Sequence, residues 1–324
     1  MPALPALLLL VPALALAADP SASLPGGYPQ RPVRLITGSP GSTAEITARL
    51  LAHKLTERWG QQVIVDSRGG AGGMVGAEIA ARSAPDGHTM VNGHIGTHAS
   101  PQFLLKSMPY DPVRDFTPVA RLTVSGIALV VGSQVQARDL REFVAMARAK
   151  PDTVNYASLG GGTSSQLSGE LFNQVTGARL WHVPYKGAGP AITGVISGEV
   201  QSAFLSTTTI SAHVRSGKMR VLAVLSRQRM AAAPEIPTAD ELGFPGVDSS
   251  VWFGLFAPAR TPRALVEAIS REVVRVIDHP ETRSLLLAQG AEPAPLAPEP
   301  FRQFVAAEIA KWGKVIRAAG LRMD

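Results

Sequence analysis

The pattern of apolar positions predicts a strand followed by a helix near the start of the chain. Residues 33–37, Val-Arg-Leu-Ile-Thr, form a short apolar run of the strand type. Beyond them, apolar residues recur at the spacing of one helix face and stop before Gly60: Ala44, Ala48, Leu51 and Leu55. A strand-type run followed by helix-type spacing predicts a strand, a loop and a helix.

The same order returns near the middle of the chain. Residues 154–157, Val-Asn-Tyr-Ala, have the composition of a strand. A helix face follows at Leu167, Leu171 and Val175, and it stops at Gly177, a residue that often ends helices.

Alternation of the two periods continues along the rest of the chain. Further strands are expected at 63–66, 88–92, 117–131, 200–205, 219–225 and 250–257. Further helices are expected at 75–81, 140–150, 210–216, 262–277, 281–289 and 299–319. Strands that alternate with helices are typical of parallel α/β units, so the predicted fold class is α/β.

Two of the predicted strands are placed to connect two lobes. The long apolar run 117–131 leads the chain into a second lobe, and 250–257 returns it to the first. We expect lobe 1 to comprise 27–125 plus 250–324 and lobe 2 to comprise 126–249. Two crossings of this kind form a hinge with a cleft between the lobes.

Two loops rich in glycine and hydroxyl groups connect a predicted strand to a predicted helix: residues 38–45 and 158–166. Helix starts leave backbone N–H groups unpaired and carry the positive end of the helix dipole. Two of them facing one cleft would hold a carboxylate or a phosphate. The alternative interpretation is that these loops only cap their helices and bind no ligand. Ser42 to Glu45 and Thr163 to Gln166 both have the capping-box spacing.

Composition fits an exported two-lobed protein. The chain has 324 residues, of which 45% are hydrophobic and 17% charged, enough for a large core. Residues 1–18 contain no charge and are rich in Leu and Ala, so they resemble a signal peptide cleaved near Ala17 or Ala18. A membrane anchor is the alternative, although Pro2, Pro5 and Pro12 interrupt this run. Export predicts a periplasmic location.

Charge and cysteine content exclude several classes. The formal net charge is +6, but Lys and Arg are scattered and only four Trp and four Tyr could stack on bases, so nucleic acid is not expected as a partner. The absence of Cys excludes disulfides, thiolate metal sites and a cysteine nucleophile.

No segment has the residue spacing of the nucleotide-binding or metal-binding motifs that it partly resembles. The glycines at 69–76 do not fit G-x-G-x-x-G, and the segment after Gly160 lacks the acidic residue that takes a ribose hydroxyl. His94 and His98 have the i, i+4 spacing of zinc ligands, but Gly93 and Gly96 favour a loop there and no H-E-x-x-H motif occurs. We expect no cofactor and no metal.

A serine hydrolase remains as an enzymatic alternative. Ser158, Ser164 and Ser165 are candidate nucleophiles, but no G-x-S-x-G elbow is present and the sequence shows no base for them.

Several motifs in one order closely resemble the solute receptors of tripartite tricarboxylate transporters, the Bug-type proteins, over essentially all of the chain after residue 27. The motifs are Tyr28-Pro-Gln-Arg-Pro32, Ala71-Gly-Gly-Met-Val-Gly-Ala77, Ala84-Pro-Asp-Gly-His88, Pro109-Tyr-Asp-Pro-Val-Arg-Asp115, Asn155-Tyr-Ala-Ser158, His182-Val-Pro-Tyr-Lys-Gly-Ala-Gly-Pro190, Ile196-Ser-Gly-Glu-Val200 and Glu308-Ile-Ala-Lys-Trp312.

This resemblance implies a type II periplasmic binding protein-like fold and a non-catalytic receptor. Such a receptor captures a small carboxylate-bearing solute and delivers it to integral membrane transporter subunits. A monomer is expected. A binding partner of a membrane sensor would have the same cleft and is the alternative within this class.

The resemblance also implies site residues. Pro40, Gly41, Ser42 and Thr43 match the first family loop, P-x-P-G-G-x-x-D, with Glu45 where the family usually has Asp. Gln166 stands where the second loop commonly has His, and the third cleft segment has Leu205 in place of a polar group. The two capped loops themselves provide the residues expected to hold the carboxylate: Ser42, Thr43, Ser158, Gly160, Gly162, Thr163 and Ser164. Those expected to tune selectivity are Thr97, Gln166 and Ser206.

Overall fold

The computed structural model describes residues 24–38, 43–231 and 233–323, and the predicted signal peptide and residues 40–42 lie outside them. Its strands are β1 (Val33–Thr37), β2 (Val63–Ser67), β3 (Thr89–Gly93), β4 (Phe116–Gly132), β5 (Asn155–Ser158), β6 (Trp181–Pro184), β7 (Ser202–Ser206), β8 (Met219–Val224), β9 (Ser250–Pro258) and β10 (Glu292–Leu296).

The helices are α1 (Thr43–Trp59), α2 (Met74–Ala81), α3 (Ile95–His98), α4 (Pro101–Leu104), α5 (Leu140–Ala149), α6 (Ser164–Thr176), α7 (Ala188–Ser197), α8 (Thr207–Arg215), α9 (Arg263–Asp278), α10 (Pro280–Ala288) and α11 (Pro298–Ala319), with 3-10 turns η1 (Pro25–Gly27) and η2 (Ala71–Gly73). Every strand and helix predicted from the sequence is present, with ends that differ by at most three residues. No helix among the described residues is both long and apolar enough to cross a membrane.

The two predicted strand–loop–helix units form as expected. The apolar stripe of α1 is buried, and β1 pairs in parallel with both β2 and β3. In the second unit, β5 pairs in parallel with β6 and β7, and α6 ends at Gly177 in the left-handed conformation. Parallel pairing places the carboxyl ends of these strands, and therefore the helix starts that follow them, at one edge of the sheet.

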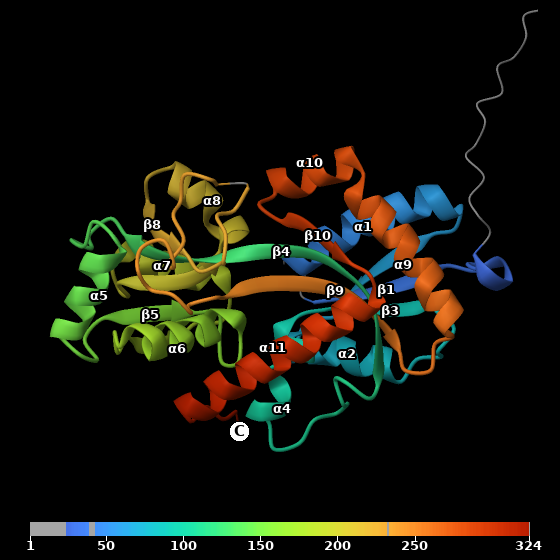
Figure 1. The fold of residues 1–324 in the computed structure, drawn as a ribbon, viewed down its shortest axis with the longest axis horizontal. Helices are drawn as coiled ribbons and strands as arrows, with labels where there is room; N and C mark the ends of the chain where they lie inside the picture. Colours follow the sequence, from blue (N-terminus) through green and yellow to red (C-terminus); the bar gives the residue numbers. More distant parts are fainter. Residues whose placement is uncertain (1–23, 39–42, 232, 324) are drawn as a thin grey trace, which may run out of the picture.

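Strand β4 connects the two halves of the sheet, whose order is β2-β1-β3-β9-β4-β7-β5-β6. Residues 116–126 of β4 pair with β9, and residues 127–132 pair with β7 and β8. Figure 1 shows β4 and β9 running side by side through the middle of the molecule. The lobe bounds given above remain predictions.

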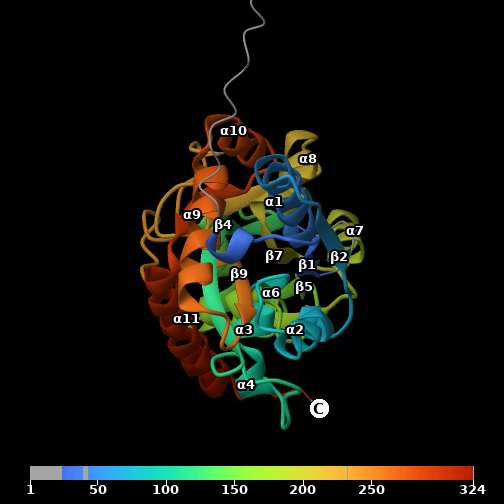
Figure 2. The same cartoon turned by 90° about the vertical axis from the view of Figure 1, so that its right-hand side faces the viewer.

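Four apolar clusters form the core, and one of them also includes Leu167 and Leu171 of α6. One pair gathers around Leu35, Leu51 and the aromatic residues of β9, and the other gathers around Phe143, Tyr156 and Val130. Helices α9 and α11 lie on one side of β4 and β9, and α2 lies on the other (Figure 2). Helix α11 also packs against α6.

Five elements escaped the sequence analysis because their local signals are weak. Helices α3 and α4 have four residues each, and α7 begins in a Gly-Ala-Gly-Pro segment that favours a turn. Strand β10 contains Pro293 and Pro295, which are tolerated because it pairs only at the edge with β4. Strand β6 is short, and its first residue, Trp181, is exposed.

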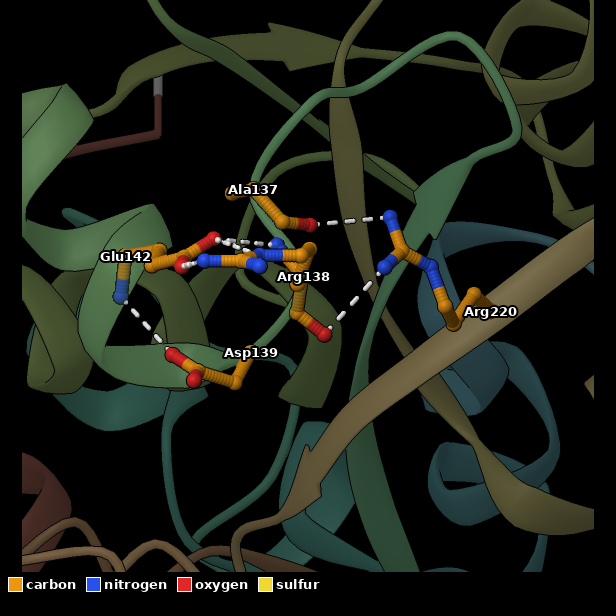
Figure 3. Close-up of polar contacts among 5 residues, drawn as sticks. All are labelled: Ala137, Arg138, Asp139, Glu142 and Arg220. Carbon is orange, nitrogen blue, oxygen red and sulfur yellow. Dashed lines mark hydrogen bonds and ion pairs between the residues drawn. The ribbon is translucent and has the colours of Figure 1, made fainter.

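Side chains fix the start of α5 against β8. Asp139 caps the helix by accepting from the backbone N–H of Glu142 at 2.9 Å. Glu142 accepts from the backbone N–H of Arg138 at 2.8 Å, and hydrogen bonds from the Arg138 guanidinium hold the pKa of Glu142 down at about 2. Arg220 donates to the carbonyl oxygens of Ala137 at 2.8 Å and Arg138 at 3.2 Å (Figure 3). This network is structural and lies outside the cavity described next.

Candidate functional site

A cavity of about 920 Å³ lies where β4 and β9 cross between the two halves of the sheet. Ile127 of β4 and Phe253 of β9 line it, together with the starts of helices from both halves. Thr43 opens α1 on one side, and Thr163 and Ser164 open α6 on the other. The arrangement brings together segments that are more than a hundred residues apart in the chain.

Several helix starts converge on this cavity. Besides α1 and α6, the first residues of α7 and α8 line it through Ala188 and Thr208. Each start has backbone N–H groups without intrahelical partners and the positive end of a helix dipole. Their sum is a positive potential that suits an anion.

The sequence-predicted site residues fall into three groups. The first group lines the cavity: Thr43, Gly162, Thr163, Ser164 and Ser206. The second group lies outside the lining: Glu45, Thr97, Ser158, Gly160 and Gln166. The third group lies outside the described residues: Pro40, Gly41 and Ser42.

Residues of the second group bond to other groups of the protein. Buried Glu45 accepts from Ser67 Oγ at 2.6 Å and pairs with Arg49 at 2.6 Å. The Thr97 hydroxyl accepts from the backbone N–H of His94 at 2.9 Å. Leu205 is fully buried among apolar residues and does not line the cavity, whereas the neighbouring Ser206 does.

The capping box predicted at Thr163 forms only in part. The Thr163 hydroxyl accepts from the backbone N–H of Gln166 at 3.4 Å, as predicted. The Gln166 side chain, however, accepts from the backbone N–H of Gly162 at 2.8 Å instead of capping Thr163. Gly162 has φ of +72°, a conformation that glycine adopts without strain. The Gly162 N–H is therefore occupied by the protein.

His94 is a cavity residue that the sequence analysis did not assign to the site. It caps α3, and its Nδ1 accepts from the backbone N–H of Gly96 at 3.0 Å, so the neutral ring carries its proton on Nε2. Burial lowers the pKa of His94 to about 4, which keeps the ring neutral at pH 7. His94 therefore offers the cavity an uncharged N–H donor.

The prediction of a loop between His94 and His98 is wrong, because residues 95–98 form the helical turn α3. The Gly96 N–H and the Thr97 hydroxyl bond to the His94 cap and stabilise this turn despite the glycine. No group of three or more potential metal ligands occurs among the described residues.

Lys186 is the only charged side chain among the described residues that line the cavity. It is exposed and precedes α7, and no ion pair of this lysine occurs within the described part of the chain. With no carboxylate in the described lining, the electrostatics favour an anionic ligand.

Replacing Lys186 by Met should therefore weaken anion binding by about fivefold, near the upper end of what one exposed charge pair contributes. Binding to the variant should also depend less on salt, because an exposed pair is screened. Isothermal titration calorimetry at two salt concentrations measures both effects. The matched control is Lys218→Met, which removes an exposed lysine outside the cavity. Equal affinities of wild type and Lys186→Met would contradict the role of Lys186 in binding the anion.

The structure places a histidine beside Ser158, where the sequence showed no candidate base. His182 Nε2 lies 2.6 Å from Ser158 Oγ. Ser158 is, however, fully buried and does not line the cavity, so a substrate in the cavity has no access to this hydroxyl. The Ser165 hydroxyl is engaged with the carbonyl oxygen of Phe204 at 2.5 Å. The Ser158–His182 contact is therefore a structural one.

Some of the missed lining residues had a signal in the sequence and others did not. Thr208 and Thr209 follow the predicted Ser206 in a run of hydroxyl residues at a strand–helix junction, the same pattern that identified residues 158–166. His94 and Phe253 had no such local signal, because only the sheet order brings β3 and β9 together.

The fold and the cavity define the class: an α/β protein of the periplasmic binding protein type, with a cavity between the two halves of its sheet. Comparisons with known proteins identify the family. The family described as Tripartite tricarboxylate transporter family receptor matches residues 47–321. The chain belongs to this family.

Relatives extend over nearly the whole chain. Protein BugT of Bordetella pertussis strain Tohama I is 33% identical over 301 residues, which cover 91% of each protein. A solved structure titled R. palustris Rpa4515 with adipate is 32% identical, has a TM-score of 0.84 and covers 91% of this chain and 99% of that one. MatC from Rhodopseudomonas palustris with bound malate is 33% identical, with a TM-score of 0.77 and coverage of 89% and 100%. The family to which the chain belongs is described as a receptor family.

Proposed function

We propose that the protein is a periplasmic receptor that captures a carboxylate-bearing metabolite for the membrane subunits of a tripartite transporter. The observation that carries this proposal is the convergence of helix starts from both halves on one cavity whose described lining holds Lys186 and no carboxylate. Such a lining can bind a negatively charged group without a metal ion and without a catalysed reaction.

The remainder of the lining indicates a ligand with an apolar body. Ile127, Leu159, Val251 and Phe253 form an apolar part of the wall. The cavity, of about 920 Å³, has room for such a body. We therefore infer a carboxylate on a chain of about six carbons or on an aromatic ring. Adipate, present in the structure of one relative, is a ligand of this size.

Contacts across the cavity support binding coupled to closure. The hydroxyls of Thr43 on α1 and Thr208 on α8 lie 3.4 Å apart. The Ser100 hydroxyl donates to the carbonyl oxygen of Gly162 at 3.3 Å. Each contact joins the two predicted lobes, so a ligand that adds further cross-cavity bonds shifts the population towards the closed form. The closed form would present the surface that the membrane subunits recognise.

A thermal-shift panel tests this proposal. The mature chain is heated with acetate, succinate, adipate, hexanoate, benzoate, citrate and inorganic phosphate. A ligand that binds only the native state raises the melting temperature. We expect adipate, hexanoate or benzoate to give the largest rise, because they satisfy both the anion site and the apolar wall. The proposal fails if no carboxylate raises the melting temperature at millimolar concentration. Turnover of esters that is lost on Ser164→Ala would instead favour a hydrolase.

A further inference from the structure

We infer that His182 is the positioning residue of the anion loop, which we define as residues 158–166, and that it holds this loop only as a neutral imidazole. The inference rests on the proposed function, because the anion loop forms one wall of the proposed ligand site. His182 itself does not line the cavity, so it acts on a ligand only through the loop.

The position of His182 follows from the strand pairing. His182 lies on β6 directly opposite Tyr156 on the parallel strand β5, and their ring centroids are 5.1 Å apart. The anion loop leaves the end of β5, so the imidazole lies against its first and last residues. His182 Nε2 is 2.6 Å from Ser158 Oγ, and its Nδ1 is 3.3 Å from Gln166 Nε2.

Each of these two partners holds one glycine of the loop. Ser158 Oγ accepts from the backbone N–H of Gly160 at 3.1 Å, and Gln166 Oε1 accepts from the backbone N–H of Gly162 at 2.8 Å. Gly160 and Gly162 both have positive φ, +119° and +72°. The two bends that shape the loop are therefore fixed by side chains that converge on one imidazole.

The hydrogen bonds determine which nitrogen of His182 carries the proton. Gln166 Oε1 is the acceptor for Gly162, so the amide group facing His182 is the Nε2 donor. Nδ1 must then accept, and Nε2–H donates to Ser158 Oγ. The Ser158 hydroxyl is left to donate to the carbonyl oxygen of Gly160, which lies 3.3 Å away. Each group in this hydrogen-bond network is matched as donor to acceptor only when the imidazole is neutral.

Protonation of His182 disrupts this hydrogen-bond network at the contact between Nδ1 and Gln166. A proton on Nδ1 would face the amide hydrogens of Gln166, and two donors repel each other. Burial lowers the pKa of His182 below its usual 6.5, so the ring is neutral at pH 7. The loop is therefore held above that lowered pKa and is released as the pH falls through it.

Among the described residues, the groups that contact the His182 ring are Ser158, Gln166 and Tyr156, and none of them is a carboxylate. Tyr156 covers the ring from β5, and its hydroxyl donates to Glu170 of α6 at 2.7 Å. Burial raises the pKa of Glu170, and its carboxyl group is bonded to Tyr156, not to the imidazole. Ser158 and Gln166, the two hydrogen-bond partners of the ring, are uncharged.

Amide signals of the ligand-free protein test the positioning role directly. In ¹H–¹⁵N NMR spectra recorded from pH 7.5 to 4.5, the Gly160 and Gly162 signals should shift with one midpoint, that of the His182 ring protons. In His182→Gln, which keeps a donor and an acceptor but cannot titrate, this step should vanish. Glycine amides that do not follow the His182 midpoint in the wild type would overturn the inference, whatever the protein binds.

Affinity gives the second test, with adipate as the probe. At pH 7.5 we expect His182→Leu to bind at least tenfold more weakly than the wild type and His182→Gln to recover most of that loss. Between pH 7.5 and 5.0 the wild type should lose at least fivefold more affinity than His182→Gln, because protonation of adipate affects both equally. His53→Gln, which removes an exposed histidine outside the cavity, should follow the wild type.

The outcomes separate the two proposals. Parallel pH profiles of the wild type and His182→Gln would overturn the role of His182 while leaving the receptor function in place. Failure of the wild type to bind adipate or any other carboxylate of the panel would overturn the proposed function, and the glycine amide titration would still decide the role of His182. If His182→Leu does not fold, His182→Gln carries both measurements.

Discussion

Replacing Ser164 by Asp should abolish carboxylate binding and leave the fold intact. Ser164 is the first residue of α6, lines the cavity and is only half-buried. An aspartate there places a carboxylate at the positive end of the helix, which is favourable for the fold. A ligand carboxylate about 4 Å away would then meet a repulsion of about 4 kcal/mol at an effective dielectric constant of 20, or roughly a thousandfold in affinity.

Calorimetric titration with adipate and a melting curve without ligand check this prediction. The melting temperature of Ser164→Asp should equal or exceed that of the wild type. The matched control is Ala264→Asp, which adds the same charge to the exposed first turn of α9, outside the cavity, and should bind as the wild type does. Unchanged affinity of Ser164→Asp would show that the ligand anion lies away from the start of α6.

Replacing Glu308 by Ala should cause the largest loss of stability. Glu308 on α11 is buried, and its Oε2 accepts from the indole N–H of Trp252 at 3.0 Å and of Trp312 at 2.8 Å. Both indoles are fully buried, so Ala would leave two donors without partners in the core and would also remove the ion pair to Lys311. Leaving such groups unpaired costs about 3 to 5 kcal/mol.

Chemical denaturation measures this loss as a lower free energy of unfolding. The control is Glu308→Gln, whose carbonyl oxygen can still accept from both indoles and whose loss should be less than half as large. Because Trp252 lies on β9, next to the cavity residues Val251 and Phe253, the alanine variant should also weaken ligand binding. A loss below about 1 kcal/mol for Glu308→Ala would contradict the role of this carboxylate.

Local patterns located most of the elements because their signals lie within a few residues. The stripe from Ala44 to Leu55 marks the buried face of α1, and Gly177 ends α6 in the left-handed conformation that glycine favours. Strand β10 was missed because its stability comes from pairing with β4, more than 160 residues earlier in the sequence, and its two prolines argue locally against a strand.

The candidate site was predictable only in part for the same reason. Thr43, Thr163 and Ser164 carry the local signature of a helix start, and the structure places all three at the cavity. Gln166 carries that signature too, yet its side chain turns to Gly162 because His182 approaches from β6. His94 and Lys186 reach the cavity from segments whose sequence shows no anion-binding pattern.

The sequence by itself determined the α/β class, the order of most strands and helices, two helix starts suited to an anion, and the family. Those properties depend on apolar spacing, on caps and on motifs, each of which is contained in a short stretch of chain. Only the tertiary structure decided which helix starts share one cavity, that Lys186 is the charge in its described lining, and that Ser158 and Gln166 meet on His182. These depend on the order of strands in the sheet, because strand pairing brings distant side chains within hydrogen-bonding distance.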